Sequence, residues 1–430
     1  MRLILLFCLF FFLSEEVFGF NPKELETKKG LKFWFVQDTS LPIISLDFGF
    51  KGGAFFDKDN KDGTSTFLAS ILDEGAGELN SINFQKKMDS IGMKLSFSSS
   101  KDFFSGKFQT VSENKENAFD LLKLVLTKPR FEKSEIEKIK NQMIASFKIS
   151  NSNVSDTAAR EFYKHFFDGH KFSKDDDGNL ESLNNIGLED LKIFFKKNLT
   201  KSNLVISISG DITENEAISL IDLSLGSLPK GPDTYKVIPS KKEFPNKVKF
   251  IKKKTPQSAV IFGHKGIARN EEDFFAARIC NYVMGGGGFQ SRLYKNVRER
   301  RGLTYSIYSY FISLQNNDIL LGGFQTKNES VKETIELVKD EWKKMNNIGI
   351  SAEELSEAKT YYKGSFTRNY ASTSTISSLL NTVQRYELGI DYFKERNKII
   401  DSLTLKKVNK VAKEIFLPEN LFFLVVGKKF

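Results

Sequence analysis

Apolar residues in the chain follow two spacings, one typical of helices and one typical of strands. Between Glu135 and Lys148, apolar residues recur every three or four positions, as on one face of a helix. Short stretches rich in valine, isoleucine and phenylalanine predict strands, and the clearest are residues 43–49, 203–209, 258–263 and 420–426. Because strands and helices come in runs rather than in strict alternation, we expect an α+β fold with helices packed on largely antiparallel sheets.

The order of these elements occurs twice along the chain. Three pairs of segments match in sequence: residues 48–52 with 262–266, 135–147 with 354–366, and 186–210 with 403–427. The members of each pair lie roughly 215 residues apart, which indicates a tandem duplication of one structural unit. A charged stretch with three prolines separates the copies. The predicted organisation is an N-terminal domain over residues 20–231, a linker over residues 232–247 and a homologous C-terminal domain over residues 248–430.

Residues 1–19 have the pattern of a signal peptide. Arg2 precedes an apolar run over residues 3–13, and the small residues Val17 and Gly19 provide a cleavage site. The run is shorter than the about 20 residues that span a bilayer. We therefore expect an exported protein, periplasmic or secreted, with no transmembrane segment after cleavage. Retention of the run as an anchor is the alternative.

Composition excludes several classes of protein. The 430 residues include 64 Lys+Arg and 54 Asp+Glu and are 40% hydrophobic, which is typical of folded globular domains and not of collagen-like or disordered chains. Signal cleavage would leave Cys280 as the single cysteine, so we expect no disulfide. The net charge of +10 indicates a lysine-rich surface, and attraction to anionic membranes or acidic peptides is the alternative.

Histidine is scarce, which limits the possible metal sites. The three histidines are His165, His170 and His264, and no two are four residues apart, so no helix can present two zinc-binding histidines on one turn. The acidic runs 57–62 and 175–179 partly resemble calcium loops. The first run, however, has a lysine at its fifth position and a leucine where such a loop needs its glutamate. We interpret both runs as solvent-exposed turns.

The segment 62–75 predicts a short helix after a glycine-rich strand end. Phe67 with Ile71, and Leu68 with Leu72, form its apolar face. This segment resembles the helix that carries the His-x-x-Glu-His motif in the pitrilysin/insulinase family of zinc metallopeptidases, the inverzincins, which include the mitochondrial processing peptidases. The resemblance extends over nearly all of the chain after residue 19 and implies a clamshell of two homologous domains.

The resemblance also implies that the zinc site of the family has been lost. The two histidines and the glutamate of the motif align with Thr66, Ser70 and Ala69, and a further zinc-binding glutamate falls near Ser146. None of these four residues can bind zinc or activate a water molecule. We therefore expect no zinc or other cofactor in this chain and no autonomous peptide hydrolysis.

In contrast, the second copy keeps two residues that the family uses in catalysis. In family members, an arginine and a tyrosine seven residues apart reach across the cleft from the second domain. The tyrosine donates to the oxyanion of the tetrahedral intermediate, and the arginine holds a carbonyl of the substrate. The resemblance assigns these roles to Arg298 and Tyr305. A surface arginine and a buried tyrosine with no catalytic role are the alternative.

A run of four glycines is a candidate for peptide binding: Gly285, Gly286, Gly287 and Gly288. Glycine backbone can move and can approach a peptide closely, although a permissive connection is an equally good interpretation. No Lys-Ser/Thr pair follows the run, so it is not a phosphate loop. Aromatic residues are too sparse among the nearby basic residues to indicate nucleic-acid binding.

A second candidate for peptide binding lies in the first copy. Residues 93–108, with Ser99 and Ser100, resemble the family's edge strand, which binds substrates by strand addition. This mode of binding reads the length and extension of a peptide more than its sequence.

Three functional hypotheses follow. The first is a non-catalytic subunit of an exported zinc peptidase, which binds extended peptides and supplies Arg298 and Tyr305 in trans to a homologous partner that holds the zinc. The second is an inactive pseudopeptidase that binds peptides or acts as a scaffold in an envelope complex. The third is an independent metallopeptidase with unconventional ligands.

Overall fold

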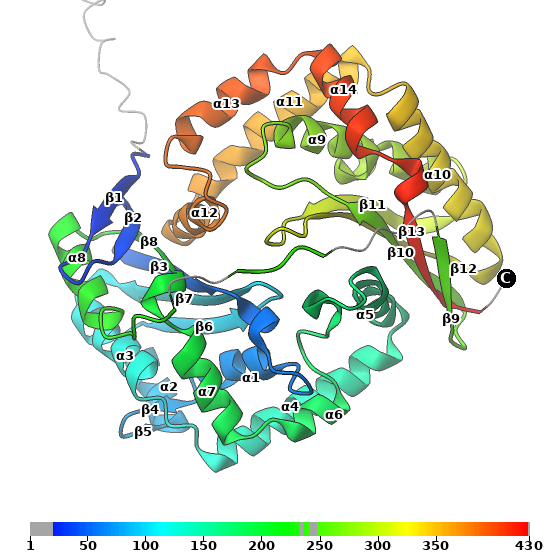
Figure 1. Cartoon of the computed structure of the whole chain (residues 1–430). Helices are drawn as coiled ribbons and strands as arrows, with labels where there is room; N and C mark the ends of the chain where they lie inside the picture. The colour runs from blue at the N-terminus through cyan, green and yellow to red at the C-terminus, as the bar shows by residue number, and fades with distance from the viewer. Residues whose placement is uncertain (1–19, 233–235, 241–246, 429–430) are drawn as a thin grey trace, which may run out of the picture.

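The computed structural model describes residues 20–232, 236–240 and 247–428, and it consists of two α+β units (Figure 1). The predicted signal peptide lies outside these residues, as does part of the predicted linker. Within the described residues, no helix has both the length and the apolar character needed to cross a membrane.

The first unit is built on a six-stranded sheet with the strand order β1-β2-β8-β3-β7-β6. Neighbouring strands are antiparallel except β2 and β8, which are parallel. The strands are β1 (Lys23–Glu26), β2 (Lys32–Gln37), β3 (Ile43–Lys51), β6 (Lys94–Ser99), β7 (Phe103–Val111) and β8 (Leu204–Gly210). The helices that belong to this unit are α1 (Thr64–Ile71), α2 (Ser81–Ser90), α3 (Lys115–Thr127), α4 (Lys133–Ser152), α6 (Leu180–Asn185), α7 (Leu188–Asn198) and α8 (Glu214–Ser224).

The second unit repeats this plan on a five-stranded sheet with the order β11-β12-β10-β13-β9, in which only β13 and β9 are parallel. The strands are β9 (Lys247–Lys252), β10 (Gln257–Lys265), β11 (Thr304–Ile312), β12 (Ile319–Lys327) and β13 (Phe422–Gly427). The helices are α9 (Phe274–Asn281), α10 (Val331–Asn347), α11 (Ala352–Phe366), α13 (Tyr392–Ser402) and α14 (Leu405–Ile415).

The strand registers of the two sheets correspond. Ser45 of β3 pairs with Gln109 of β7, and Ala259 of β10 pairs with Gln325 of β12 at the matching position. The prediction of two α+β units with largely antiparallel sheets is therefore confirmed. The exact domain boundaries remain predictions.

The prediction of one edge strand over residues 93–108 is wrong. The segment forms two strands, β6 and β7, and only β6 lies at the edge of the sheet. The turn between them is held by its own side chains. Lys101 forms an ion pair with Asp176 at 2.8 Å and Asp102 forms one with Arg385 at 2.6 Å, so both charged side chains of the turn are fixed by other parts of the chain.

The two units exchange one helix each. Helix α5 (Val154–Phe166), from the first copy, packs on β10 and β13 of the second sheet, and α12 (Thr373–Arg385), from the second copy, packs on β3 and β8 of the first (Figure 1). Phe162 of α5 packs against Phe422 with ring centroids 5.6 Å apart. Each sheet is thus covered on both faces, which explains why β3 and β13 are buried almost throughout.

Candidate functional site

Helix α1, which carries the degenerate zinc motif, begins at a left-handed glycine. Gly63 has a φ of 92°, and a side chain there would collide with the backbone of Asp177 and Gly178. The carboxylate of Asp57 accepts hydrogen bonds from the backbone N–H groups of Gly63 (2.8 Å) and Ser65 (2.9 Å). These bonds satisfy donors that the first turn of a helix leaves free. Burial raises the pKa of Asp57 to about 8, against the lowering effect of these bonds.

The hydroxyl groups at the motif positions on α1 are hydrogen-bonded within the chain, which leaves no side-chain group there to bind a metal. The hydroxyl of Thr66 donates to the backbone carbonyl of Asp176 at 2.7 Å, and the hydroxyl of Ser70 donates to the carbonyl of Thr66 at 2.9 Å. Ala69 is buried. Ser146 lies on α4, which packs against α1, and its side chain is exposed. The fold thus brings the two helices of the zinc site together, but the residues present do not fit zinc.

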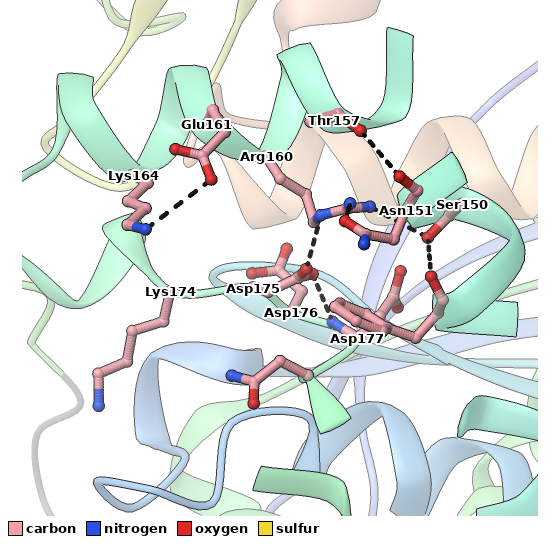
Figure 2. A network of polar contacts seen from close by, with 12 residues as sticks. Ser150, Asn151, Thr157, Arg160, Glu161, Lys164, Lys174, Asp175, Asp176 and Asp177 are labelled. Atoms are coloured by element: carbon pink, nitrogen blue, oxygen red, sulfur yellow. Dashed lines mark hydrogen bonds and ion pairs between the residues drawn. The ribbon is translucent and has the colours of Figure 1, made fainter. Parts of the chain in front are cut away.

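The two acidic runs pair with basic side chains. Figure 2 shows Arg160 of α5 directed at Asp175, with an Nε–Oδ2 distance of 3.5 Å, while its other nitrogens reach Ser150 and Asn151 at the end of α4. In the same network Lys174 bonds to Asp59 at 2.6 Å. Burial raises the pKa of Asp175 to about 6. These contacts tie the 175–177 loop over α1 to α4 and α5, which is a structural role, so the interpretation as simple solvent-exposed turns was incomplete.

The histidines are also engaged elsewhere. His264 is buried between Trp342, whose Nε1 donates to His264 Nε2 at 3.0 Å, and the carbonyl of Lys265, 2.7 Å from Nδ1. Burial lowers the pKa of His264 to about 4. His170 lies 2.7 Å from the carbonyl of Ile238. Among the described residues, no three His, Cys, Asp or Glu side chains are grouped so that they could hold a metal ion.

Tyr305 lies on β11, an edge strand of the second sheet, and is 87% exposed. The register of β11 against β12 shifts between Thr304 and Ile307, which places Tyr305 in a β-bulge. The Thr304 hydroxyl holds the bulge by bonding to the backbone of Ser306. Bulges at sheet edges redirect side chains and occur beside active sites. The alternative of a buried tyrosine is therefore wrong, and the sequence pattern gave no sign of the bulge.

Arg298 precedes β11 at the end of a π-helical turn, Tyr294–Glu299. Its guanidinium lies over the ring of Tyr294, 5.2 Å from the centroid, and it makes no ion pair with a carboxylate of the described residues. It is exposed to solvent. Such π-helical turns are frequent at functional sites. Arg298 and Tyr305 are thus both free to contact another molecule.

Tyr305 borders a hollow of about 350 Å³ that lies between the second sheet and the start of α5. Ser155 and Asp156 of α5 form its other side. Further along β11, Tyr308 and Tyr310 are exposed, and their rings stack at 5.7 Å. The sequence patterns above predict no strand over residues 304–312, and the alternation of Tyr308 and Tyr310, typical of a strand, is the signal that could have indicated these exposed side chains.

The first two glycines of the predicted peptide-binding run pack closely within the chain. Gly285 is buried in a π-helical turn, Tyr282–Gly286, where a side chain would collide with Ser309 of β11. Gly286 ends that turn, and a Cβ there would lie 2.8 Å from the side-chain nitrogen of Asn281. Glycine at Gly285 is therefore explained by packing against β11, whereas Gly286 is exposed and restricted only by its closeness to Asn281.

The last two glycines of the run differ from each other. The N–H of Gly287 donates to the backbone carbonyl of Tyr282 at 2.8 Å, and a Cβ at Gly287 would lie 2.7 Å from the same oxygen. This contact closes the π-helical turn, so Gly287, like Gly285, is in contact with its own unit in this structure. Gly288, with a φ of 58°, has open space around it. Contact between the run and a peptide remains a prediction.

The two serines of the predicted edge strand lie at its end. Ser99 is the last residue of β6, and Ser100 follows in the turn to β7. The Ser100 hydroxyl donates to the carbonyl of Phe103 at 3.1 Å, so it helps to hold the turn. A role of these serines in binding peptides remains a prediction.

Comparisons with known proteins give one family for both units. Residues 36–174 match the family model described as insulinase (peptidase family M16), and residues 185–362 match the model described as peptidase M16 inactive domain. The Helicobacter pylori protein named non-peptidase homolog YmxG is 27% identical, over 92% of this chain and 91% of its own length.

Solved structures share the whole fold. The peptidase M16 inactive domain from Pseudomonas fluorescens superposes with a TM-score of 0.90 at 28% identity, covering 95% of this chain and 99% of that one. The periplasmic protease PqqL from Escherichia coli has the same fold at 18% identity, with a TM-score of 0.81 over 97% of this chain. The match covers 46% of the PqqL chain.

Proposed function

Because this chain belongs to the insulinase family, peptidase family M16, we propose that it is a non-catalytic subunit that supplies Arg298 and Tyr305 to the active site of a homologous, zinc-bearing partner. The chain itself is an inactive member of the family. Thr66, Ala69 and Ser70 replace the residues of the zinc motif, and a relative with nearly the same length is named a non-peptidase homolog.

The observation that carries this proposal is that Tyr305 and Arg298 are both exposed to solvent. A tyrosine that served only packing would be buried, whereas Tyr305 is 87% exposed on a bulge, and Arg298 has no acidic partner among the described residues. A hydroxyl placed at a developing oxyanion can be worth about 3 to 4 kcal/mol, and the arginine keeps its charge at any relevant pH. Both groups therefore suit a transition state formed on another subunit.

The PqqL comparison supports an arrangement in two subunits. This chain corresponds in fold to about half of that protease, so two chains of this size would match one chain of PqqL. We therefore place the zinc in a separate homologous subunit and not in this chain. The signal-like residues 1–19 and the description of PqqL as periplasmic support export to the periplasm or beyond.

Extended peptides are the proposed substrates of the complex. β6 and β11 lie at the edges of their sheets, so each leaves backbone donors and acceptors for an added strand. Strand addition reads the extended form of a peptide more than its sequence. This mode of binding suits a chamber shared by two subunits.

Reconstitution with a zinc-bearing partner tests the proposal. The partner should be a homologue with an intact His-x-x-Glu-His motif, sought first in the neighbouring reading frames. Each protein alone should be inactive, and the mixture should cleave peptides. Tyr305→Phe and Arg298→Ala should each lower kcat by about 100-fold or more without preventing assembly.

Arg300→Ala is the matched control, since Arg300 is exposed and bonds only to the Asn296 side chain at 2.9 Å. Full activity of the Tyr305→Phe and Arg298→Ala complexes would contradict the proposal. Peptide binding without any partner-dependent cleavage would instead favour the second hypothesis, a peptide-binding or scaffold protein.

A further inference from the structure

A second cavity, of about 890 Å³, lies where the two units face each other. Its first wall is the face of the first sheet, formed by β3, β6 and β7. Its second wall comes from the other unit, by way of α9, α11, α12 and α13. Five basic side chains line it: Lys94, Lys107, Arg269, Arg278 and Arg396. None of these residues belongs to the Arg298 and Tyr305 site.

The three arginines of this cavity have no acidic partners among the described residues. Arg278 packs its guanidinium on the ring of Tyr362, 4.6 Å from the centroid. Arg269 bonds only to the hydroxyl of Ser313 and lies over the ring of Tyr386. Burial lowers the pKa of Arg269, and the neighbouring positive charge of Arg278 acts in the same direction. Arg269 and Arg278 are half-buried and Arg396 is buried, and none of the three has a carboxylate partner in the described parts of the chain. The cluster therefore leaves positive charge in the cavity wall that would attract an anion from outside the chain.

Arg396 is the most deeply buried of the three arginines. It is 3% exposed, and it spends two of its nitrogens on the carbonyl of Tyr362 (2.9 Å) and the side chain of Asn397 (2.8 Å). Its Nε is buried and has no hydrogen-bond partner. A buried, unsatisfied donor on a charged group is costly. The guanidinium packs on the ring of Phe366, 4.0 Å from the centroid, so Arg396 holds its positive charge within the wall of the cavity.

Asp47 is the one acidic residue in the lining, and it is already engaged. Its carboxylate accepts hydrogen bonds from Ser377 at 2.6 Å and Ser378 at 3.1 Å, both on α12. Lys107 lies 4.0 Å from it, and 64% of the lysine side chain is exposed at the mouth of the cavity. Asp47 therefore joins α12 to the sheet and leaves the arginines uncompensated.

The matching hollow in the second unit provides an internal comparison. It too is bounded by a sheet face and by the first turns of the exchanged helix, and Ser155, Asp156 and Ala159 of α5 take the places of Ser374, Thr375 and Ser378 of α12. That hollow, which borders Tyr305, has no lysine or arginine in its lining. Its helix carries an acidic residue in the first turn, whereas α12 has none. The duplication accounts for the two cavities, and the positive charge belongs to one of them.

We propose that the 890 Å³ cavity is a binding site for a small ligand that carries several oxyanion groups, either phosphates or carboxylates. The volume lies within the range for small-molecule sites. Lys94 and Lys107 at the mouth attract the ligand, and the half-buried guanidinium groups of Arg269 and Arg278 bind its oxygens, a geometry that arginine suits better than lysine. The N-terminus of α12, where Ser374 and Thr375 line the cavity, adds the positive end of a helix dipole.

Calorimetric titration of the full mature chain with tripolyphosphate and, separately, with citrate tests the site. At least one of the two should bind with a one-to-one stoichiometry, more weakly as salt is raised, and the better of the two identifies phosphate or carboxylate as the preferred group. Arg278→Gln and Lys107→Gln should each weaken binding by about tenfold, because each removes a charged partner of the ligand. Arg300→Gln, on the exposed surface away from the cavity, should bind as the wild type does.

The use of two variants allows weaker binding to be distinguished from misfolding. Lys107 is largely exposed, so Lys107→Gln should fold normally even if Arg278→Gln is destabilised, which thermal unfolding would reveal. Absence of binding by both probes overturns the proposal, and so does unchanged binding in both cavity variants. The test needs no partner subunit, so its outcome is independent of the role proposed for Arg298 and Tyr305.

Discussion

Arg385 and Asp102 form an ion pair that joins the two copies of the duplicated unit, with 2.6 Å between Nη2 and Oδ1. The side chain of Asp102, in the turn between β6 and β7, is almost fully buried. Its second oxygen accepts a hydrogen bond from the backbone N–H of Gln315, at 2.9 Å, in the turn between β11 and β12. One carboxylate therefore connects the hairpins of both sheets and the exchanged helix α12.

Asp102→Ala is expected to lower the free energy of unfolding by about 3 to 5 kcal/mol, because it leaves the Arg385 charge and the Gln315 N–H without a partner. Urea unfolding followed by circular dichroism measures the loss. Asp401→Ala is the matched control, since the Lys363–Asp401 pair is exposed and should contribute at most about 1 kcal/mol. Equal losses of unfolding free energy in Asp102→Ala and Asp401→Ala would contradict the role assigned to the Asp102 carboxylate.

The exchange of α5 and α12 predicts that the two units unfold together. The chain has two tryptophans, and the structure places one in each unit: Trp34 packs against α12, and Trp342 lies in the core of the second unit. In Trp34→Phe the fluorescence reports on the second unit, and in Trp342→Phe it reports on the first. In both variants the fluorescence transition should coincide with the loss of helical circular dichroism. Separate transitions would mean that the units fold independently.

A substitution of one side chain on α5 provides a second test of the helix exchange. Phe162 is fully buried, and α5 presents it to the second sheet beside Phe422. Phe162→Ala should cost about 3 to 5 kcal/mol by leaving a cavity. Ile149→Ala on α4, where the side chain is 71% exposed, should change stability by less than about 0.5 kcal/mol. A small effect of Phe162→Ala would show that α5 contributes little to the second unit.

The duplication could be predicted from the sequence because both copies kept matching strand and helix patterns. The helix exchange could not, since periodicity identifies the apolar face of α12, with Ile376, Leu380 and Val383, but not the sheet that this face covers. Those residues pack against Trp34 and Val36, more than three hundred positions earlier in the chain.

For the candidate site, too, some features could be predicted from the sequence and others could not. The loss of the zinc-binding histidines at Thr66 and Ser70, and of the glutamate at Ala69, could be predicted from the resemblance to the family and the residues at those positions. The exposure of Tyr305 depends on a bulge, which is a matter of strand register between β11 and β12. The basic cavity depends on side chains from both copies, among them Lys107 and Arg278, that are brought together only when the two units pack.

Metal removal should have no effect on this chain. The motif positions on α1 bond to backbone carbonyls or are buried, and His170 and His264 bond to other groups. The melting temperature should therefore be the same with EDTA and with added zinc, and the purified protein should contain well below one zinc per chain by elemental analysis. A zinc-dependent rise in melting temperature would favour the hypothesis of unconventional ligands instead.

His264 should make the protein less stable in weak acid. Its pKa is lowered from 6.5 to about 4 in the folded chain, so as the pH falls from about 6.5 to 4 the unfolded state takes up a proton that the folded state does not. The free energy of unfolding should fall over that window by about 3 kcal/mol from this residue. Urea unfolding at several pH values measures the slope, and His264→Gln, which can still accept the Trp342 N–H, should be flatter than the wild type. His165→Gln, at a partly exposed position, should keep the His264 contribution, and equal slopes in the wild type and His264→Gln would contradict the prediction.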